Sequence, residues 1–145
     1  NSSSDHLYDK MVKVLVVEDD SIWKGVHQRG LGRVVGEENI DFVDDYAAAV
    51  TRSNQSVYDA YVLDGEFPRS PGQKIEPLGL QLAKDISQKV WGYERIRFVS
   101  GRPSVLEEAH QLGIRKLYSK GLPDEAKGQK PAMQLALDLK QEFNL

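Results

Sequence analysis

The 145-residue sequence contains no cysteine. Disulfide bonds, thiolate metal ligands and thiol nucleophiles are therefore excluded. The three histidines, His6, His27 and His110, are too far apart in sequence to form a recognisable ligand motif. Zinc sites and cysteine chemistry are not expected in this protein.

Long hydrophobic runs and basic blocks are also missing. No apolar run approaches the roughly 18 residues of a membrane span, and the first residues lack the basic and apolar parts of a signal peptide. The chain has 19 Lys and Arg against 22 Asp and Glu, a formal charge of -3, and no Lys/Arg block that could neutralise a row of phosphates. We expect a cytoplasmic protein with no direct nucleic-acid or membrane partner.

What is present fits one folded domain. With 40% hydrophobic and 28% charged residues, the chain can build and solvate a packed core. We expect residues 1–10 to be a flexible or expression-derived tail and residues 11–145 to form one soluble globular domain.

Apolar stretches rich in β-branched and aromatic residues predict five strands. Residues 14–17, 61–63 and 98–99 are typical of buried strands. Residues 40–43 and 115–118 alternate in part, which favours strands nearer a sheet edge.

Helical patterns separate these strands. The first is expected to start at Asp20 or Ser21 and to end at the glycines Gly30 and Gly32. Its predicted packed face carries Ile22, Trp23 and Val26. The other helical patterns cover residues 45–53, 78–90, 103–112 and 131–143. In the last of them the predicted packed face carries Met133, Ala136, Leu137 and Phe143, widened by Leu135 and Leu139.

Strands that alternate with single helices specify parallel βαβ units with right-handed crossovers. The predicted class is α/β, a doubly wound five-stranded parallel sheet with helices on both faces. In such sheets, functional residues gather at the carboxyl ends of the strands.

Charged and hydroxyl side chains follow four of the predicted strands. Residues 18–20 (Glu-Asp-Asp) follow the first strand, and residues 64–66 (Asp-Gly-Glu) the third. Ser100 ends the fourth and Lys120 the fifth. Clustered carboxylates repel one another unless a cation relieves them. An all-oxygen acidic cluster suits Mg²⁺, so we expect a magnesium site here.

Four segments at these strand ends carry a resemblance to a known family: residues 14–20, residues 62–68 with Pro68 four places after Asp64, residues 99–101, and residues 113–120. Together they resemble the receiver domain of two-component response regulators. The resemblance covers residues 11–145. It implies a flavodoxin-like strand order 2-1-3-4-5 and a signalling phosphoacceptor that catalyses only its own phosphorylation and dephosphorylation.

The same resemblance assigns roles to the strand-end residues. Asp64 is similar to the phosphoacceptor, Asp19 to a direct Mg²⁺ ligand, and Glu18 to the acid that holds a metal-bound water. The side chain of Asp64 is also expected to bind the Mg²⁺ ion. The backbone carbonyl of Glu66 would be a further ligand, and its side chain is expected to influence the lifetime of the phosphorylated state. Ser100 would hydrogen-bond the phosphoryl group and Lys120 would pair with it.

The resemblance also implies partners. A sensor histidine kinase or a phosphotransfer protein would supply the phosphoryl group, and a downstream protein would bind the last helix and the fifth strand. No output domain is expected in this chain, and we expect a monomer or weak dimer. His27 and His110 are expected to face solvent or to satisfy a neighbour.

The chain departs from the family at three places. Gly121 follows the lysine where receivers usually have proline, which puts the customary cis peptide in doubt. Leu117 takes the usual aromatic position, and alternation would send Tyr118 to the other face of the sheet. The loops 69–78 and 121–130 are long, so they either shape partner choice or are tolerated surface insertions.

Two alternative functions stay open. The departures favour a receiver-like interaction scaffold that works without phosphorylation, although all five candidate side chains, Glu18, Asp19, Asp64, Ser100 and Lys120, are retained. A phosphohydrolase with an aspartyl nucleophile is less favoured, because such enzymes prefer Asp-x-Asp after the first strand. Flavin binding would need phosphate-binding donors where this chain has acids.

Overall fold

A computed structural model describes residues 11–120 and 129–145. The predicted tail, residues 1–10, lies outside the described residues. The described elements, in chain order, are β1 (Val14–Val17), α2 (Ser21–Val35), the 3-10 helix η1 (Glu37–Asn39), β2 (Ile40–Val43), α3 (Tyr46–Gln55), β3 (Ala60–Asp64), β4 (Phe67–Pro68), β5 (Ile75–Glu76), α4 (Gly79–Val90), β6 (Ile96–Ser100), α5 (Pro103–Leu112), β7 (Lys116–Ser119) and α6 (Gln129–Glu142). None of these helices is long and apolar enough to cross a membrane.

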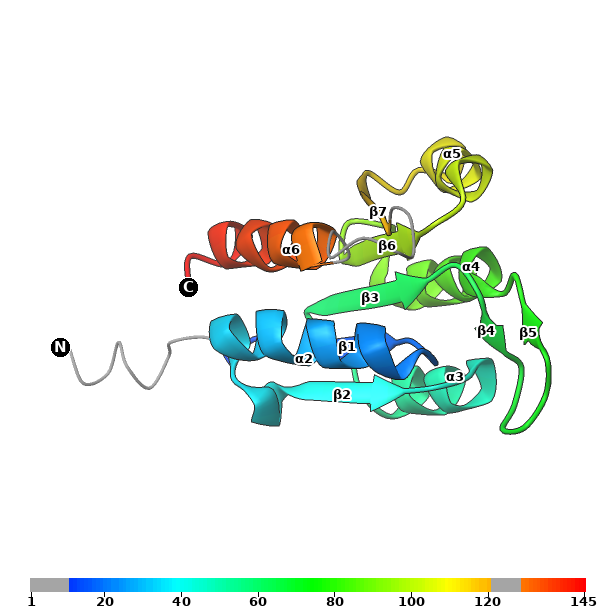
Figure 1. The fold of residues 1–145 in the computed structure, drawn as a ribbon, viewed down its shortest axis with the longest axis horizontal. Coiled ribbons are helices and arrows are strands. Elements are labelled where there is room, and N and C mark those ends of the chain that lie inside the picture. The colour runs from blue at the N-terminus through cyan, green and yellow to red at the C-terminus, as the bar shows by residue number, and fades with distance from the viewer. Residues whose placement is uncertain (1–10, 121–128) are drawn as a thin grey trace, which may run out of the picture.

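The main sheet has five parallel strands in the order β2-β1-β3-β6-β7. Figure 1 shows the strands side by side, with helices packed around them. The predicted doubly wound α/β sheet and its strand order are confirmed. The five predicted strands match β1, β2, β3, β6 and β7 in number and position, with small shifts at their ends.

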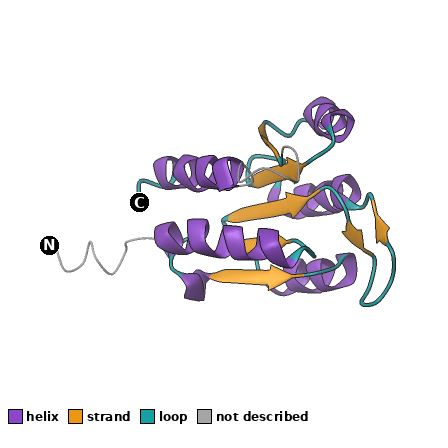
Figure 2. Cartoon of the chain, in the orientation of Figure 1, coloured by secondary structure: helices purple, strands orange, loops and turns teal. Residues whose placement is uncertain are grey.

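Helices cover both faces of the sheet, as Figure 2 illustrates. One buried cluster joins Leu15 and Leu63 of the sheet to residues of α3, α4 and α5, such as Ala49, Leu82 and Ala109. The opposite cluster joins Val16 and Val62 to Leu31 of α2 and Leu135 of α6. Alternate residues of each buried strand therefore serve the two cores, which is why these strands are apolar throughout.

Helix α2 is longer than its sequence pattern indicates. It passes through Gly30 and Gly32 and ends at Gly36, whose φ is 88° and whose N–H bonds the carbonyl of Gly32. A Cβ on Gly30 would lie 3.6 Å from the Ala132 carbonyl of α6, so the two helices pack closely there. That packing offsets the roughly 1 kcal/mol that an interior glycine costs a helix. The prediction that Gly30 and Gly32 end the helix is wrong.

The inward faces of α2 and α6 also differ from the prediction. Ile22 is 74% exposed, whereas His27 is buried at 2%, so of the two environments expected for His27, solvent or a neighbouring group, solvent is wrong. On α6, Met133 and Leu137 point outward at 58% and 54% exposure. The residues of α6 that pack on the sheet are Ala132, Leu135, Ala136 and Leu139. An apolar pattern that wraps more than half of a helix does not define which side packs inward.

The long segment after β3 forms a small antiparallel hairpin, β4 and β5, instead of an unstructured loop. Phe67 at its start is fully buried in the core that faces α3, α4 and α5. The carbonyl of Arg69 accepts a hydrogen bond from the N–H of Ala47 at 3.0 Å, which ties the hairpin to the start of α3. Strands of two residues are too short to give a sequence pattern.

The C-terminal half of α6 is fastened to β6 and β7 by charged and polar side chains. Arg97 has no exposed surface, and its Nη2 lies 2.5 Å from Oε1 of Glu142. Lys116 reaches the same carboxylate at 2.8 Å. The hydroxyl of Tyr118 donates to Asp138 at 2.6 Å. We call these five side chains the α6 cluster.

Candidate functional site

The register of the central strands brings two acidic residues together. Val17 of β1 pairs with Leu63 of β3, so the next residues along the two strands, Glu18 and Asp64, are neighbours. Both are buried, with 1% and 8% of their surface exposed. The predicted convergence of strand-end carboxylates is therefore present in the structure.

A third acid completes the group. Carboxylate oxygens of Glu18, Asp19 and Asp64 all lie within 4.8 Å of one another, and we call these three residues the acidic cluster. The adjacent Asp20 does not belong to it. Its Oδ1 accepts the N–H groups of Ile22 and Trp23 at 2.8 and 3.4 Å and so caps α2. Three consecutive acids thus divide between a cluster and a helix cap.

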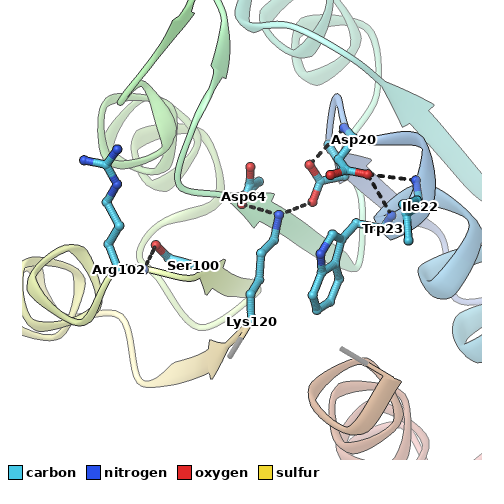
Figure 3. A network of polar contacts seen from close by, with 8 residues as sticks. Asp20, Ile22, Trp23, Asp64, Ser100, Arg102 and Lys120 are labelled. Carbon is cyan, nitrogen blue, oxygen red and sulfur yellow. Dashed lines mark hydrogen bonds and ion pairs between the residues drawn. The ribbon is translucent and has the colours of Figure 1, made fainter. Parts of the chain in front are cut away.

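Lys120 is the cation of this site. Its Nζ lies 2.7 Å from Oε1 of Glu18 and 2.9 Å from Oδ1 of Asp64. Figure 3 shows the lysine side chain reaching Asp64 from the end of β7, with Trp23 beside it. The ammonium is thus paired with two carboxylates at once. Three carboxylates against one ammonium leave the site with an excess of negative charge when all are ionised.

Burial and mutual repulsion perturb the ionisation of these groups. Burial, together with the charge of Asp64, raises the pKa of Glu18 to about 7, although Lys120 acts in the opposite direction. Burial also raises the pKa of Asp64, against the opposing effect of Lys120. For Lys120, burial acts to lower the pKa, but the two carboxylates outweigh it and the pKa is raised. A cation that enters the cluster favours the ionised carboxylates.

The donor set fits a hard divalent cation. All candidate ligands are carboxylate oxygens, and Mg²⁺ is usually held by one or two carboxylates plus water. Glu18, Asp19 and Asp64 are close enough to share one ion. The side chain of Glu66 points elsewhere, because its carboxylate pairs with Arg102 at 3.0 Å.

Ser100 lies beside the loop that follows Asp64. It is 3% exposed, and a Cβ on Gly65 would lie only 3.1 Å from its Oγ. Its Oγ accepts the N–H of Arg102 at 3.1 Å, and its carbonyl accepts the N–H of Lys120 at 3.0 Å. The structure therefore gathers Glu18, Asp19, Asp64, Ser100 and Lys120 at one edge of the sheet.

Gly79, the first residue of α4, approaches the same loop. A Cβ at this position would lie 2.3 Å from the carbonyl oxygen of Asp64, which no real structure tolerates. The N–H of Gly79 donates to the carbonyl of Gly65 at 3.1 Å. Only glycine permits this approach, so the helix start holds the backbone of Asp64 in place.

Besides Gly79, three side chains near the site carry no prediction of a role there: Trp23, His27 and Arg102. Trp23 and His27 were assigned to helix positions alone, and Arg102 carried no signal. Their roles depend on which side chains meet across different elements. His27 lies against Trp23 with ring centroids 5.7 Å apart, and burial together with the charge of Lys120 lowers its pKa to about 4.

One of the predicted departures at the site can be located, that of the fifth strand. Leu117 packs with the core that faces α3, α4 and α5, and Tyr118 packs on the opposite side, so the predicted alternation is confirmed. Gly121 and most of the second long loop lie outside the described residues. No cis peptide is present among the residues that the structure describes.

No protein-family model and no curated protein sequence matches the chain. Solved structures do match its fold. The phosphorylated cyanobacterial phytochrome response regulator RcpA aligns with a TM-score of 0.70 at 14% identity, over 93% of this chain and 95% of that one. The response regulator domain of Thermotoga maritima CheB aligns with a TM-score of 0.65 at 20% identity, over 94% and 98%. The Mn²⁺-bound form of response regulator Rcp1 aligns with a TM-score of 0.68 at 14% identity, over 90% and 92%. The chain has the fold of response regulator receiver domains.

Proposed function

We propose that residues 11–145 form a response regulator receiver domain that accepts a phosphoryl group on Asp64 in a Mg²⁺-dependent reaction. The donor is a sensor histidine kinase or a phosphotransfer protein, and the phosphorylated surface signals to a downstream protein. The observation that carries the proposal is the contact of Lys120 with Asp64 at 2.9 Å inside a cluster of three carboxylates. A cytoplasmic location is part of the proposal.

Comparison supports this proposal at the level of fold and chemistry. One matching structure is a phosphorylated response regulator, and another is a Mn²⁺-bound response regulator. This chain has the same fold and carries an oxygen-only acidic cluster at the carboxyl ends of its strands. Ligands bind at that edge in doubly wound sheets.

Asp64 is the nucleophile of the proposed reaction. One of its carboxylate oxygens forms a bond to phosphorus while the bond from phosphorus to the donor's nitrogen or oxygen breaks, and the donor keeps that electron pair. A carboxylate needs no general base, since it attacks in its ionised form. Phosphoryl transfer depends mainly on positioning and on neutralisation of charge.

Lys120 and Ser100 stabilise the transferred group. The ammonium already lies at Asp64 and can pair with a phosphoryl oxygen, and the hydroxyl of Ser100 can donate to another. Glu18, Asp19 and Asp64, with the backbone carbonyl of Glu66, would hold Mg²⁺, which would supply positive charge to the phosphoryl oxygens.

Intact-mass measurement after incubation with acetyl phosphate and Mg²⁺ tests the proposal. We expect a gain of one phosphoryl group, lost in Asp64→Asn. Asp59→Asn is the matched control, because Asp59 precedes the same strand at its opposite end, where it accepts the N–H of Lys13. A phosphoryl gain that persists in Asp64→Asn would overturn the assignment.

A receiver-like scaffold is the second candidate, favoured by Leu117 at the usual aromatic position. It predicts partner binding that is the same with and without phosphodonor. Met133 and Leu137 of α6 point outward and would contribute to the partner surface with or without phosphodonor. No phosphoryl gain at any donor concentration, with partner binding intact, would favour this candidate.

A further inference from the structure

The ammonium of Lys120 has a third partner besides two carboxylates. Its Nζ lies 4.9 Å from the centroid of the Trp23 ring. An aromatic face attracts a cation within about 6 Å of the ring centroid. In Figure 3 the indole stands next to the lysine side chain, on the side of the ammonium away from Ser100.

The Trp23 ring is held by neighbours of its own. Its backbone belongs to the first turn of α2, which Asp20 caps. The ring also meets the imidazole of His27 at a centroid distance of 5.7 Å, and His27 is 2% exposed. The ring therefore meets the ammonium of Lys120 on one side and a buried imidazole on another, on a helix start that the cap fixes.

A divalent cation in the acidic cluster would change the surroundings of Lys120. Oε1 of Glu18 contacts the ammonium at 2.7 Å, and Glu18 also belongs to the group of acids that could hold one ion. Two cations that share these oxygens repel each other strongly at such short range. Of the three partners Glu18, Asp64 and Trp23, the Trp23 indole is the one without a charge, so a metal ion does not compete for it.

We propose that Trp23 is a positioning residue for Lys120, whose ammonium it keeps beside Asp64 when a divalent cation takes over Glu18. With this contact, Lys120 still lies beside Asp64 after it loses Glu18 as a partner. The catalytic consequence rests on the proposed phosphoacceptor function, whereas the contact itself can be tested without any phosphodonor.

The first test measures the rate at which Asp64 gains a phosphoryl group from acetyl phosphate at saturating Mg²⁺. We expect Trp23→Leu to lower this rate about fivefold, equivalent to about 1 kcal/mol, because the aliphatic side chain offers no π face. Trp23→Tyr keeps an aromatic face and should stay within about twofold of the parent. Trp91→Leu is the control, since Trp91 is 95% exposed at the end of α4. A parent-like rate in Trp23→Leu overturns the proposal.

The second test needs no phosphate and no substitution of Trp23. The chain has two tryptophans, so in Trp91→Phe all tryptophan emission comes from Trp23. We expect Mg²⁺ to change this emission, and we expect Lys120→Met to remove most of the change. Lys24→Met is the matched control, because Lys24 follows Trp23 directly but pairs with Asp44 instead. A Mg²⁺ response that is absent, or equal in Lys120→Met and its parent, overturns the proposal.

The two tests separate this inference from the proposed function. A Lys120-dependent emission change without any phosphoryl gain would leave the positioning contact standing and refute the phosphoacceptor function. Phosphorylation of Asp64 at the same rate in the parent and in Trp23→Leu would keep the function and refute the positioning role.

Discussion

Two groups of partly buried charges serve different purposes in this molecule. In the acidic cluster, Glu18, Asp19 and Asp64 face one ammonium, that of Lys120. In the α6 cluster, the cations Arg97 and Lys116 face the two carboxylates of Glu142 and Asp138, with Tyr118 between strand and helix. The first group carries an excess of negative charge, and the second is balanced.

The difference concerns what each group can still bind. A balanced group has its charges satisfied within the fold and fastens α6 to the sheet. In the group with unmatched carboxylates, burial is the main cause that raises the pKa of Glu18 and of Asp64, and an added cation favours the ionised form of both. Charge balance therefore separates a structural polar cluster from a candidate site more clearly than burial does, since each group combines buried and partly exposed side chains.

The comparison predicts its largest effect in the α6 cluster. Glu142→Leu leaves the buried guanidinium of Arg97 without its carboxylate, and a stranded buried charge is costly. We expect the free energy of unfolding in urea to fall by about 3 kcal/mol, with Mg²⁺ affinity unchanged. The double variant Arg97→Met/Glu142→Leu should recover most of the loss. If Glu142→Leu instead weakened Mg²⁺ binding, the two clusters would not be independent.

A second prediction uses His27, a buried base next to the acidic cluster. Its pKa is about 4 in the folded chain, lowered from 6.5 by burial and then by the charge of Lys120. Between those two values the unfolded chain binds more protons, so stability decreases as pH falls through this window. From pH 7 to pH 5 we expect this group to remove about 2 kcal/mol of the free energy of unfolding.

The matched variant for this effect is His27→Gln, which is polar but does not titrate. Its free energy of unfolding should fall less than that of the parent over the same pH interval. Urea unfolding of both proteins at the two pH values measures the difference. Equal pH dependence in both proteins would show that the pKa of His27 is the same in the folded and the unfolded chain.

The third prediction concerns the affinity of the acidic cluster for Mg²⁺. Asp19→Asn removes one of three carboxylates, and we expect Mg²⁺ affinity to fall about tenfold, equivalent to about 1.4 kcal/mol. Asp20→Asn is the matched control because Asp20 caps α2 and asparagine is an equally good cap. Calorimetric titration of the two variants measures both affinities. Equal losses in both would place the metal outside the acidic cluster.

The smallest effect is expected at the exposed rim of the site. Arg102 holds Glu66 at 3.0 Å, and both side chains are partly or largely exposed, so the pair is weak. Arg102→Ala frees a carboxylate that repels the developing hydroxide of an attacking water. We expect loss of the phosphoryl group from Asp64 to slow about threefold, equivalent to about 0.7 kcal/mol.

The effect of Arg102 should depend entirely on Glu66. In the background of Glu66→Ala, the further change Arg102→Ala should leave the rate of phosphoryl loss unaltered. Timed intact-mass measurements on the single and double variants check this. A change of equal size in both backgrounds would mean that Arg102 acts on the phosphoryl group directly.

The sheet was predictable because buried parallel strands are continuous apolar runs. β2 has the predicted limits, residues 40–43, and the polar residues that follow each strand marked the site edge. The helix faces were less predictable. Ile22, Met133 and Leu137 are apolar yet point outward, and only packing of the helices on the sheet decides that. Gly30 lies inside a helix because α6 approaches it.

For the candidate site, residue types were predictable and partnerships were not. Asp64 and Lys120 were predicted to converge, and they do. The contact of Lys120 with Trp23 joins residues almost a hundred positions apart, and neither carries a local signal for it. The need for glycine at position 79 likewise has no local signal. It arises because the start of α4 meets the end of β3.

The hydrogen bond between Gly79 and Gly65 has a consequence for protein engineering. It closes the excursion that contains β4 and β5 at its base, so the chain leaves and returns at one point beside Asp64. Phe67 anchors the excursion in the core, but residues 71–74 form an exposed turn. A peptide epitope or a fluorophore-binding tag inserted in that turn would lengthen only the far end of a closed loop. The turn is therefore a place to attach a reporter close to the site without altering its geometry.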